Sequence, residues 1–239
     1  QHLGKLGARE ERSLTQPHPP AGSAALLGVL GPRSRASAAL ARVVDPASIP
    51  AHIGGLSCHD AAALLARDDQ RMAIRLLAGW LSTREAVWWA CLCLEQILKW
   101  GGDIGSPALL TRVAQWVNLQ DPAIANELAA AALGQKPVDM LAAAVSLTRD
   151  NISPDAKHPV APKPGLAHRM TALAILGASS PIPESYRQPC LHHLIELGLD
   201  VAECLHPWVE KAIPYHPGLR SESARAVLAT TGNIWENWK

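Results

Sequence analysis

Two cysteine-containing stretches combine residue types that could bind a metal or activate a thiol. Cys91-x-Cys93 has the spacing of half a zinc site, but residues two apart on a helix point about 200° from each other and cannot bind one ion. Cys58-His59-Asp60 contains the residue types of a thiol triad, although adjacent side chains rarely converge as a triad requires. We therefore expect Cys91 and Cys93 to be buried small residues, and Asp60 to serve the first turn of a helix.

A second set of candidate zinc ligands lies later in the chain, in Cys190-x-His192-His193 and in a Cys-x-His at residues 204–206. On a helical projection, Cys190 lies at the edge of the apolar face and both histidines lie on the opposite side. The cysteine at 204 falls among apolar residues of a following helix. Because the cysteines point inward and the histidines outward, no zinc site is predicted. His192 and Glu196 are expected to form an exposed pair.

Composition excludes several function classes and predicts no metal or cofactor. The net charge is +1 with Lys and Arg spread along the chain, whereas a nucleic-acid-binding protein needs a clustered basic face. Five cysteines, an odd number without framework spacing, predict reduced thiols and a cytoplasmic protein. The longest strongly apolar run, Ala86 to Leu94, is about half of a membrane span, so no membrane insertion is expected.

The apolar residues predict an all-α fold. Hydrophobic residues make up 48% of the 239 residues and are mainly Ala and Leu, which favour helices, while Phe is absent. A Trp near a helix end, a cap and an Ala-rich helix occur twice, at Trp80 and at Trp116. This spacing favours an irregular bundle of antiparallel helix pairs, with about eight to ten short helices.

Three segments differ in composition. Residues 1–56 contain six prolines and are predicted to be a Pro-rich extended arm with short helices. Residues 57–231 form the predicted helical domain, in which the capping box of Ser82 and Glu85 starts the strongest helix. Residues 232–239 are a Trp-containing tail. The predicted helices of the domain span 58–67, 69–79, 83–100, 107–117, 122–133, 137–147, 165–177, 183–197, 200–213 and 217–229.

The predicted helix Thr83–Trp100 is apolar on most of its circumference. Its polar residues fall in one narrow sector, and Trp88 and Leu92 lie inside that sector at positions i and i+4. A Trp among charges has two explanations: another segment of the chain covers it, or it forms a partner site. We name Trp88 and Leu92 as candidate partner-binding residues.

The stretch Arg84-Glu85-Ala86-Val87-Trp88-Trp89-Ala90-Cys91 resembles an uncharacterised bacterial family, a domain of unknown function with an Arg-Glu-Ala-Val-x-Trp-x-Cys type motif. The resemblance covers roughly residues 58–200. It implies an all-helical cytoplasmic protein and supplies no catalytic residues. It also implies relatives near secretion or contractile-injection genes, and therefore a subunit of a bacterial assembly of the type VI secretion kind.

The tail carries an apolar face that would be costly to leave in water. Ile234, Trp235 and Trp238 fit one side of a helical turn. They dock either on their own domain or on a partner as a short anchor. We name them as further candidate partner-binding residues.

These observations favour a non-catalytic protein-binding adaptor or scaffold that contacts another protein through the arm and the tail. The alternative is a helical enzyme or small-molecule-binding protein with a site around the 151–169 loop, using His168 and Arg169. A third possibility is a homo-oligomer that pairs through an apolar patch around Trp88.

Overall fold

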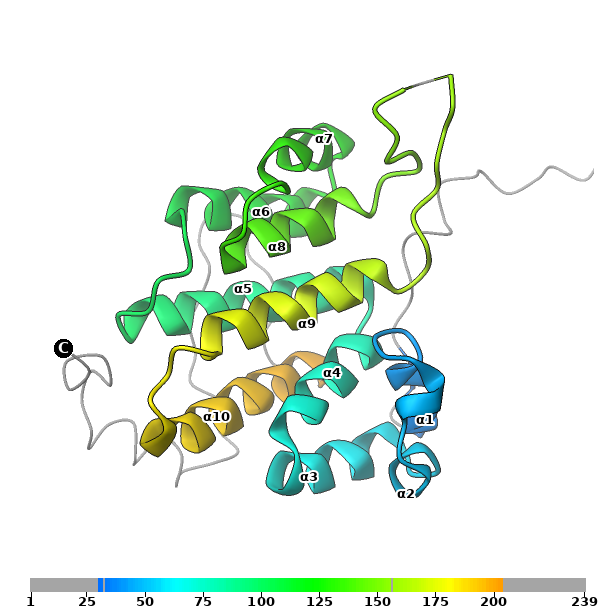
Figure 1. The fold of residues 1–239 in the computed structure, drawn as a ribbon, viewed down its shortest axis with the longest axis vertical. Helices are drawn as coiled ribbons and strands as arrows, with labels where there is room; N and C mark the ends of the chain where they lie inside the picture. Colours follow the sequence, from blue (N-terminus) through cyan, green and yellow to red (C-terminus); the bar gives the residue numbers. More distant parts are fainter. Residues whose placement is uncertain (1–29, 32, 156, 204–239) are drawn as a thin grey trace, which may run out of the picture.

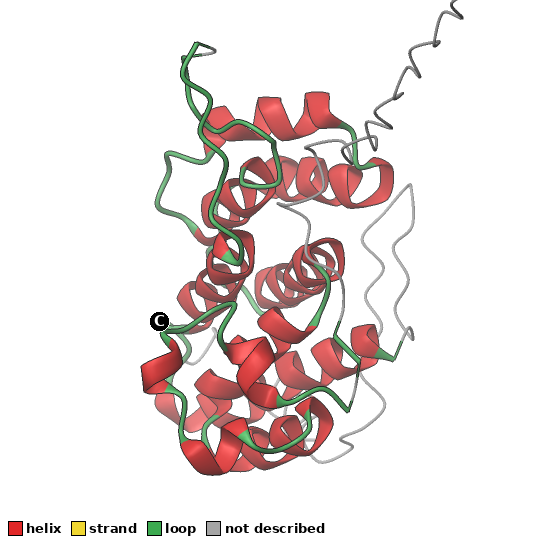
Figure 2. Ribbon diagram, turned by 90° about the vertical axis from the view of Figure 1, so that its right-hand side faces the viewer, coloured by secondary structure: helices red, strands yellow, loops and turns green. Residues whose placement is uncertain are grey.

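The computed structural model describes residues 30–31, 33–155 and 157–203, and within these ranges it contains helices and loops but no strand. This confirms the all-α prediction. Figure 2 shows the same helices from a second direction. The elements are α1 (Ala36–Leu40), the 3-10 turn η2 (Pro46–Ser48), α2 (Ala51–Gly54), α3 (Cys58–Asp68), α4 (Gln70–Trp80), α5 (Thr83–Lys99), α6 (Pro107–Leu119), α7 (Pro122–Ala131), α8 (Pro137–Ser146), α9 (Leu166–Ser179) and α10 (Glu184–Ala202).

Helices α5 and α9 lie side by side through the middle of the described part (Figure 1). On one side, α6, α7 and α8 pack on each other, and α8 contacts both central helices. On the other side, α4 contacts α9 and α10, while α1 and α3 pack on α4. The central pair thus separates two groups of helices, and both groups contribute to one continuous apolar core.

Side-chain caps and prolines set the starts of these helices. The Ser82 hydroxyl accepts from the Glu85 backbone N–H, and the Glu85 carboxylate accepts from the Ser82 N–H at 2.9 Å, so the predicted capping box starts α5. Asp121 caps α7 and Pro122 follows at its first position, where a missing N–H costs nothing. Gly101, at φ 85°, ends α5 in the left-handed conformation that favours glycine.

Helix α5 is buried on nearly its whole circumference, including the sector that contains Trp88 and Leu92. Both side chains are 0% exposed. The reason is that α4, α6, α8, α9 and α10 all pack on α5, which leaves little of its polar sector open to solvent. Residues of the chain itself therefore cover Trp88 and Leu92, which is the first of the two explanations considered for this sector.

Part of the predicted arm lies against the helical body. Ala39 and Leu40 of α1 are fully buried against α4. A Cβ at Gly79 would lie 2.0 Å from the Ala39 carbonyl oxygen, so glycine allows α1 and α4 to approach this closely. Arg42 Nη1 donates to the Gly79 carbonyl at 3.0 Å and fixes the contact. Residues 1–29, and the tail at 232–239, lie outside the described residues.

Candidate binding pocket between α6, α7 and the loop after α8

The described cysteines are buried in apolar surroundings. Burial raises the pKa of Cys58 to about 11 and that of Cys190 to about 12, and it also raises the pKa values of Cys91 and Cys93. A thiol at these positions remains protonated and unreactive at neutral pH. Within the described ranges, no three His, Cys, Asp or Glu side chains gather closely enough to hold a metal ion.

The two histidines on α10 do not lie as the projection predicts. His193 is 0% exposed, with its ring centroid 5.9 Å from that of Trp100, and Glu196 is 4% exposed. The expected outward position of His193 and Glu196 is therefore wrong, because α10 is buried around most of its circumference. Half-buried His192 places Nε2 3.6 Å from a Glu196 carboxylate oxygen, so this pair is adjacent but not exposed as expected.

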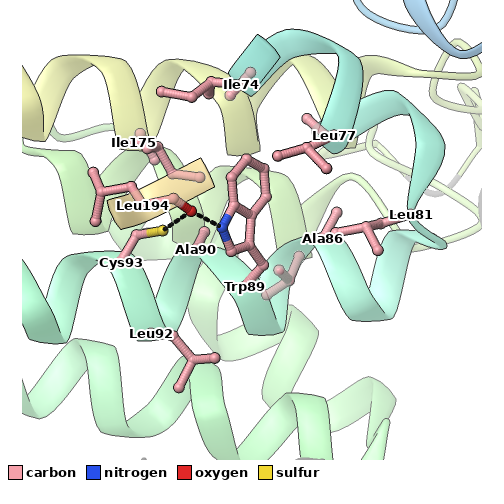
Figure 3. Packing of buried hydrophobic residues seen from close by; sticks show 14 of the residues in the cluster. Ile74, Leu77, Leu81, Ala86, Trp89, Ala90, Leu92, Cys93, Ile175 and Leu194 are labelled. Atoms are coloured by element: carbon pink, nitrogen blue, oxygen red, sulfur yellow. Dashed lines mark hydrogen bonds between the residues drawn. The ribbon is translucent and has the colours of Figure 1, made fainter. Parts of the chain in front are cut away.

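The second Trp of the family-like stretch joins α5 to α10. Trp89 Nε1 donates to the Leu194 carbonyl at 2.8 Å, and Cys93 Sγ lies 3.9 Å from the same oxygen (Figure 3). A Cβ at Gly198 would lie 2.8 Å from the indole, so the approach of Trp89 requires glycine there. These residues hold the core together and present no reactive group.

Arg84, which opens the family-like stretch, joins α5 to α6. Its Nε donates to the Val117 carbonyl at 2.6 Å, and Nη2 donates to the Asn118 carbonyl at 2.8 Å. These carbonyls belong to the last turn of α6, where a cation also complements the helix dipole. Arg84 therefore fixes the end of α6, from which one wall of the candidate pocket is built.

His168, named for the alternative function, is buried in the core. Its Nε2 lies 3.2 Å from the Leu81 carbonyl, and the side chain is 1% exposed. Burial and the nearby Arg42 charge lower the pKa of His168 to about 4, so the ring is neutral at physiological pH. Arg169 is exposed on α9. Neither residue is among those that line the pocket between α6, α7 and the loop after α8.

A pocket of about 540 Å³ lies between the end of α6, the start of α7 and the loop after α8. Its walls combine amide, hydroxyl and charged side chains with one Trp. The lining residues are Trp116, Gln120, Pro122, Ala125, Asn126, Thr148, Arg149, Asp150, Asn151 and Ser153.

Local hydrogen bonds build these walls. Gln120, at φ 52°, ends α6 in the left-handed conformation, and α7 starts two residues later. Arg149 lies just beyond the end of α8, where its Nε donates to the Ser146 carbonyl at 2.9 Å. Its Nη1 donates to Asn126 Oδ1 at 3.3 Å and so connects α7 to the loop.

The loop itself folds around one side chain. Asn151 Oδ1 accepts from the backbone N–H groups of Ser153 and Val160, each at 2.8 Å. The Ile152 N–H also donates to the Val160 carbonyl at 2.9 Å. These bonds bring the two arms of the loop together and hold Asn151 and Ser153 at the rim of the pocket.

Most of the residues that line the pocket are not the candidate site residues predicted from the sequence. Trp88 and Leu92 lie in the core, and Ile234, Trp235 and Trp238 lie outside the described residues. The 151–169 prediction does include Asn151 and Ser153. Trp116, which is 2% exposed, was noted only as part of a repeat. The sequence feature that could have indicated Trp116 as a pocket residue is its position just before a polar helix end and the Asp121-Pro122 cap.

Comparisons with known proteins identify a family and no closer relative. Residues 61–202 match the model described as a family of unknown function, DUF6931, which covers more than half of the chain. Searches of curated proteins and of solved structures each found no significant match. The family part of the resemblance is thereby confirmed, while the motif and the bacterial origin stay predictions. Within the described ranges, no helix has the length and hydropathy of a membrane span.

Proposed function

Because the chain belongs to this family, whose description assigns no activity, we propose its function from the geometry. The protein is a non-catalytic adaptor that holds a segment of a partner protein in the pocket between α6, α7 and the loop after α8. The observation that carries this proposal is the composition of the pocket wall. It combines several hydrogen-bonding side chains with Trp116, while the described thiols and His168 are buried elsewhere.

The wall suits a peptide because an extended backbone presents rows of carbonyl and N–H groups. Side-chain amides can donate to and accept from such a backbone with little regard to its sequence. Gln120, Pro122 and Asn126 are exposed at the mouth, so a longer chain can enter and leave the pocket. Trp116, which is 2% exposed, forms a further part of the pocket wall.

Two further elements of the proposal come from the sequence. The tail residues Ile234, Trp235 and Trp238 are proposed as a second contact, since an apolar helical turn is a common anchor. The resemblance supports a cytoplasmic bacterial assembly, linked to a type VI-like secretion system, as the setting. Both proposals concern the partner and not the chemistry of the pocket.

The second candidate function is binding of a small molecule in the same pocket. Its volume of about 540 Å³ lies within the range of small-molecule sites, roughly 300–1,000 Å³. The contribution of Asn151 and Ser153 also matches the loop that the alternative predicts. A free ligand needs the pocket alone, whereas a partner protein also contacts the surface around it.

The two candidates are separated by affinity capture from the organism that encodes the protein. Four baits are used: the wild-type chain, Asn126→Trp, Ala130→Trp and a chain that ends at residue 231. Asn126 lines the pocket, while Ala130 is exposed one turn further along the same helix and is not among the lining residues, so Ala130→Trp is the matched control.

The adaptor proposal predicts one protein that the wild-type and Ala130→Trp baits retain and that Asn126→Trp loses. Loss with the shortened chain would support the tail as the second contact. Retention of the same proteins by Asn126→Trp at undiminished yield would remove the pocket from the proposal. Recovery of a bound metabolite without any protein would favour the small-molecule candidate.

A further inference from the structure

The amide side chains of the pocket have their oxygens engaged by the protein. Gln120 Oε1 accepts from Arg84 Nη1 at 3.4 Å, and Asn126 Oδ1 accepts from Arg149 Nη1 at 3.3 Å. Asn151 Oδ1 accepts from two backbone N–H groups of its own loop, each at 2.8 Å. An amide oxygen accepts up to two hydrogen bonds, so Asn151 Oδ1 is fully used, while Gln120 Oε1 and Asn126 Oδ1 each accept one of these bonds.

The side-chain groups that remain wholly unused are donors. In the part of the chain that the structure describes, the side-chain nitrogens of Gln120, Asn126 and Asn151 make no hydrogen bond. Arg149 uses Nε and Nη1 but has no carboxylate within ion-pair distance among the same residues. We call Gln120, Asn126, Arg149 and Asn151 the donor cluster.

One carboxylate in the pocket lining, that of Asp150, opposes the positive charge of Arg149. Asp150 lines the pocket and is exposed, whereas Arg149 beside it is half-buried and tied to Ser146 and Asn126. Water screens an exposed charge more strongly than a partly buried one. Arg84, bonded to Gln120, adds a second guanidinium next to the pocket. The donor cluster is therefore the stronger electrostatic feature.

From this arrangement we infer that the pocket binds a carboxylate, with Arg149 pairing with its charge and the three amide nitrogens donating to its oxygens and to neighbouring carbonyls. A guanidinium offers the planar donor pair that matches a carboxylate. This inference rests on the proposed function, for which it names the ligand chemistry. The carboxylate comes from an acidic side chain or chain end of the partner, or from a free small acid.

Peptide selection tests the first source. A random peptide library is displayed and selected on the full-length wild-type protein, and the selected peptides are resynthesised with each acid replaced by its amide. We expect selected peptides to carry an Asp, a Glu or a free C-terminal carboxylate, and the amide versions to bind at least about tenfold more weakly. Titration of acetate, succinate, glutarate and citrate by calorimetry tests the second source.

Substitutions then locate the interaction. Arg149→Gln should weaken carboxylate binding at least about tenfold, Arg149→Lys should weaken it less, and Asp150→Asn should strengthen it. Arg112→Gln is the matched control. Arg112 on α6 pairs with Glu127 on α7, and neither residue lines the pocket. Unchanged thermal melting of each variant shows that the fold is retained.

The outcomes separate the inference from the proposed function. Peptides that bind in the pocket equally well as acids and amides would leave the adaptor in place and overturn the carboxylate inference. Free acids that bind through Arg149, with no peptide selected, would uphold the inference and point to the small-molecule candidate. No Arg149-dependent binding of any peptide or acid would overturn the inference.

Discussion

Two helical glycines have opposite surroundings. At Gly198 in α10, a Cβ would lie 2.8 Å from the Trp89 ring and 2.9 Å from Leu77 Cδ1. At Gly177 in α9, the nearest atom to a Cβ would be Met140 Sδ at 3.9 Å, which is ordinary contact. The same substitution should therefore change stability in opposite directions at the two sites.

We predict that Gly198→Ala destabilises the protein by about 1–3 kcal/mol, because the methyl group displaces Trp89 from its bond to Leu194. Gly177→Ala should stabilise it by roughly 0.5–1 kcal/mol through helix propensity. Urea unfolding followed by circular dichroism measures both values. Equal effects of the two substitutions would contradict the packing described for α5 and α10.

Buried His168 makes stability depend on pH. Its pKa is about 4 in the folded chain against an ordinary value of 6.5, so the unfolded chain binds more protons between these values. The stabilisation is complete above pH 6.5 and is lost as the pH falls towards 4, by on the order of 3 kcal/mol. His168→Gln should flatten this part of the profile, whereas His158→Gln, in the exposed loop, should leave it unchanged. The free energy of unfolding is measured with urea at pH 7.0 and pH 4.5. The same loss of stability between these pH values in the wild type, His168→Gln and His158→Gln would refute the role of His168.

Residue burial was only partly predictable. Cys91 and Cys93 are buried as expected, because residues on an almost wholly apolar helix face the core on any side. Projection places Trp88 in a polar sector and His193 and Glu196 opposite the apolar face, yet all three are buried. A projection describes one helix, whereas burial depends on how many neighbours pack around it, and that number is set by the rest of the fold.

At the scale of elements, Arg84 connects the start of α5 to the end of α6. Arg84→Gln removes charged hydrogen bonds to the Val117 and Asn118 carbonyls and should cost about 1–2 kcal/mol. Hydrogen exchange should increase in the last turn of α6, next to Gln120. Arg112→Gln, at an exposed pair on α6, should change stability much less. Unchanged exchange at the end of α6 in Arg84→Gln would show that the contact does not hold this wall.

The starts of α5 to α8 were the most predictable feature because capping residues mark them locally, whereas the predicted break between 197 and 200 is wrong, since α10 continues to Ala202. The capping box starts α5 at Thr83, and Pro107, Pro122 and Pro137 start α6, α7 and α8 as expected. The pocket was not predictable in the same way. It depends on Arg149 reaching Asn126, 23 residues away in sequence, and no local pattern records such a contact.

At the scale of the whole molecule, the four described cysteines report on the integrity of the core. All are buried, and burial raises each thiol pKa, so little thiolate forms in the folded protein. In a Cys204→Ser variant, we predict that these thiols react with Ellman's reagent at pH 8 only on unfolding. The rate should rise with urea in step with the loss of helical signal. Rapid labelling without denaturant would contradict the buried positions.

The most direct test of the central claim is photo-crosslinking in the native host with a benzophenone amino acid at residue 126 or at residue 63. Both positions are exposed, but Asn126 lines the pocket, whereas Ala63 lies on α3 in the other group of helices. We predict one covalent adduct with a partner protein from position 126 and none from position 63. Equal adducts from both positions, or no adduct from 126, would contradict the claim that this pocket holds a partner.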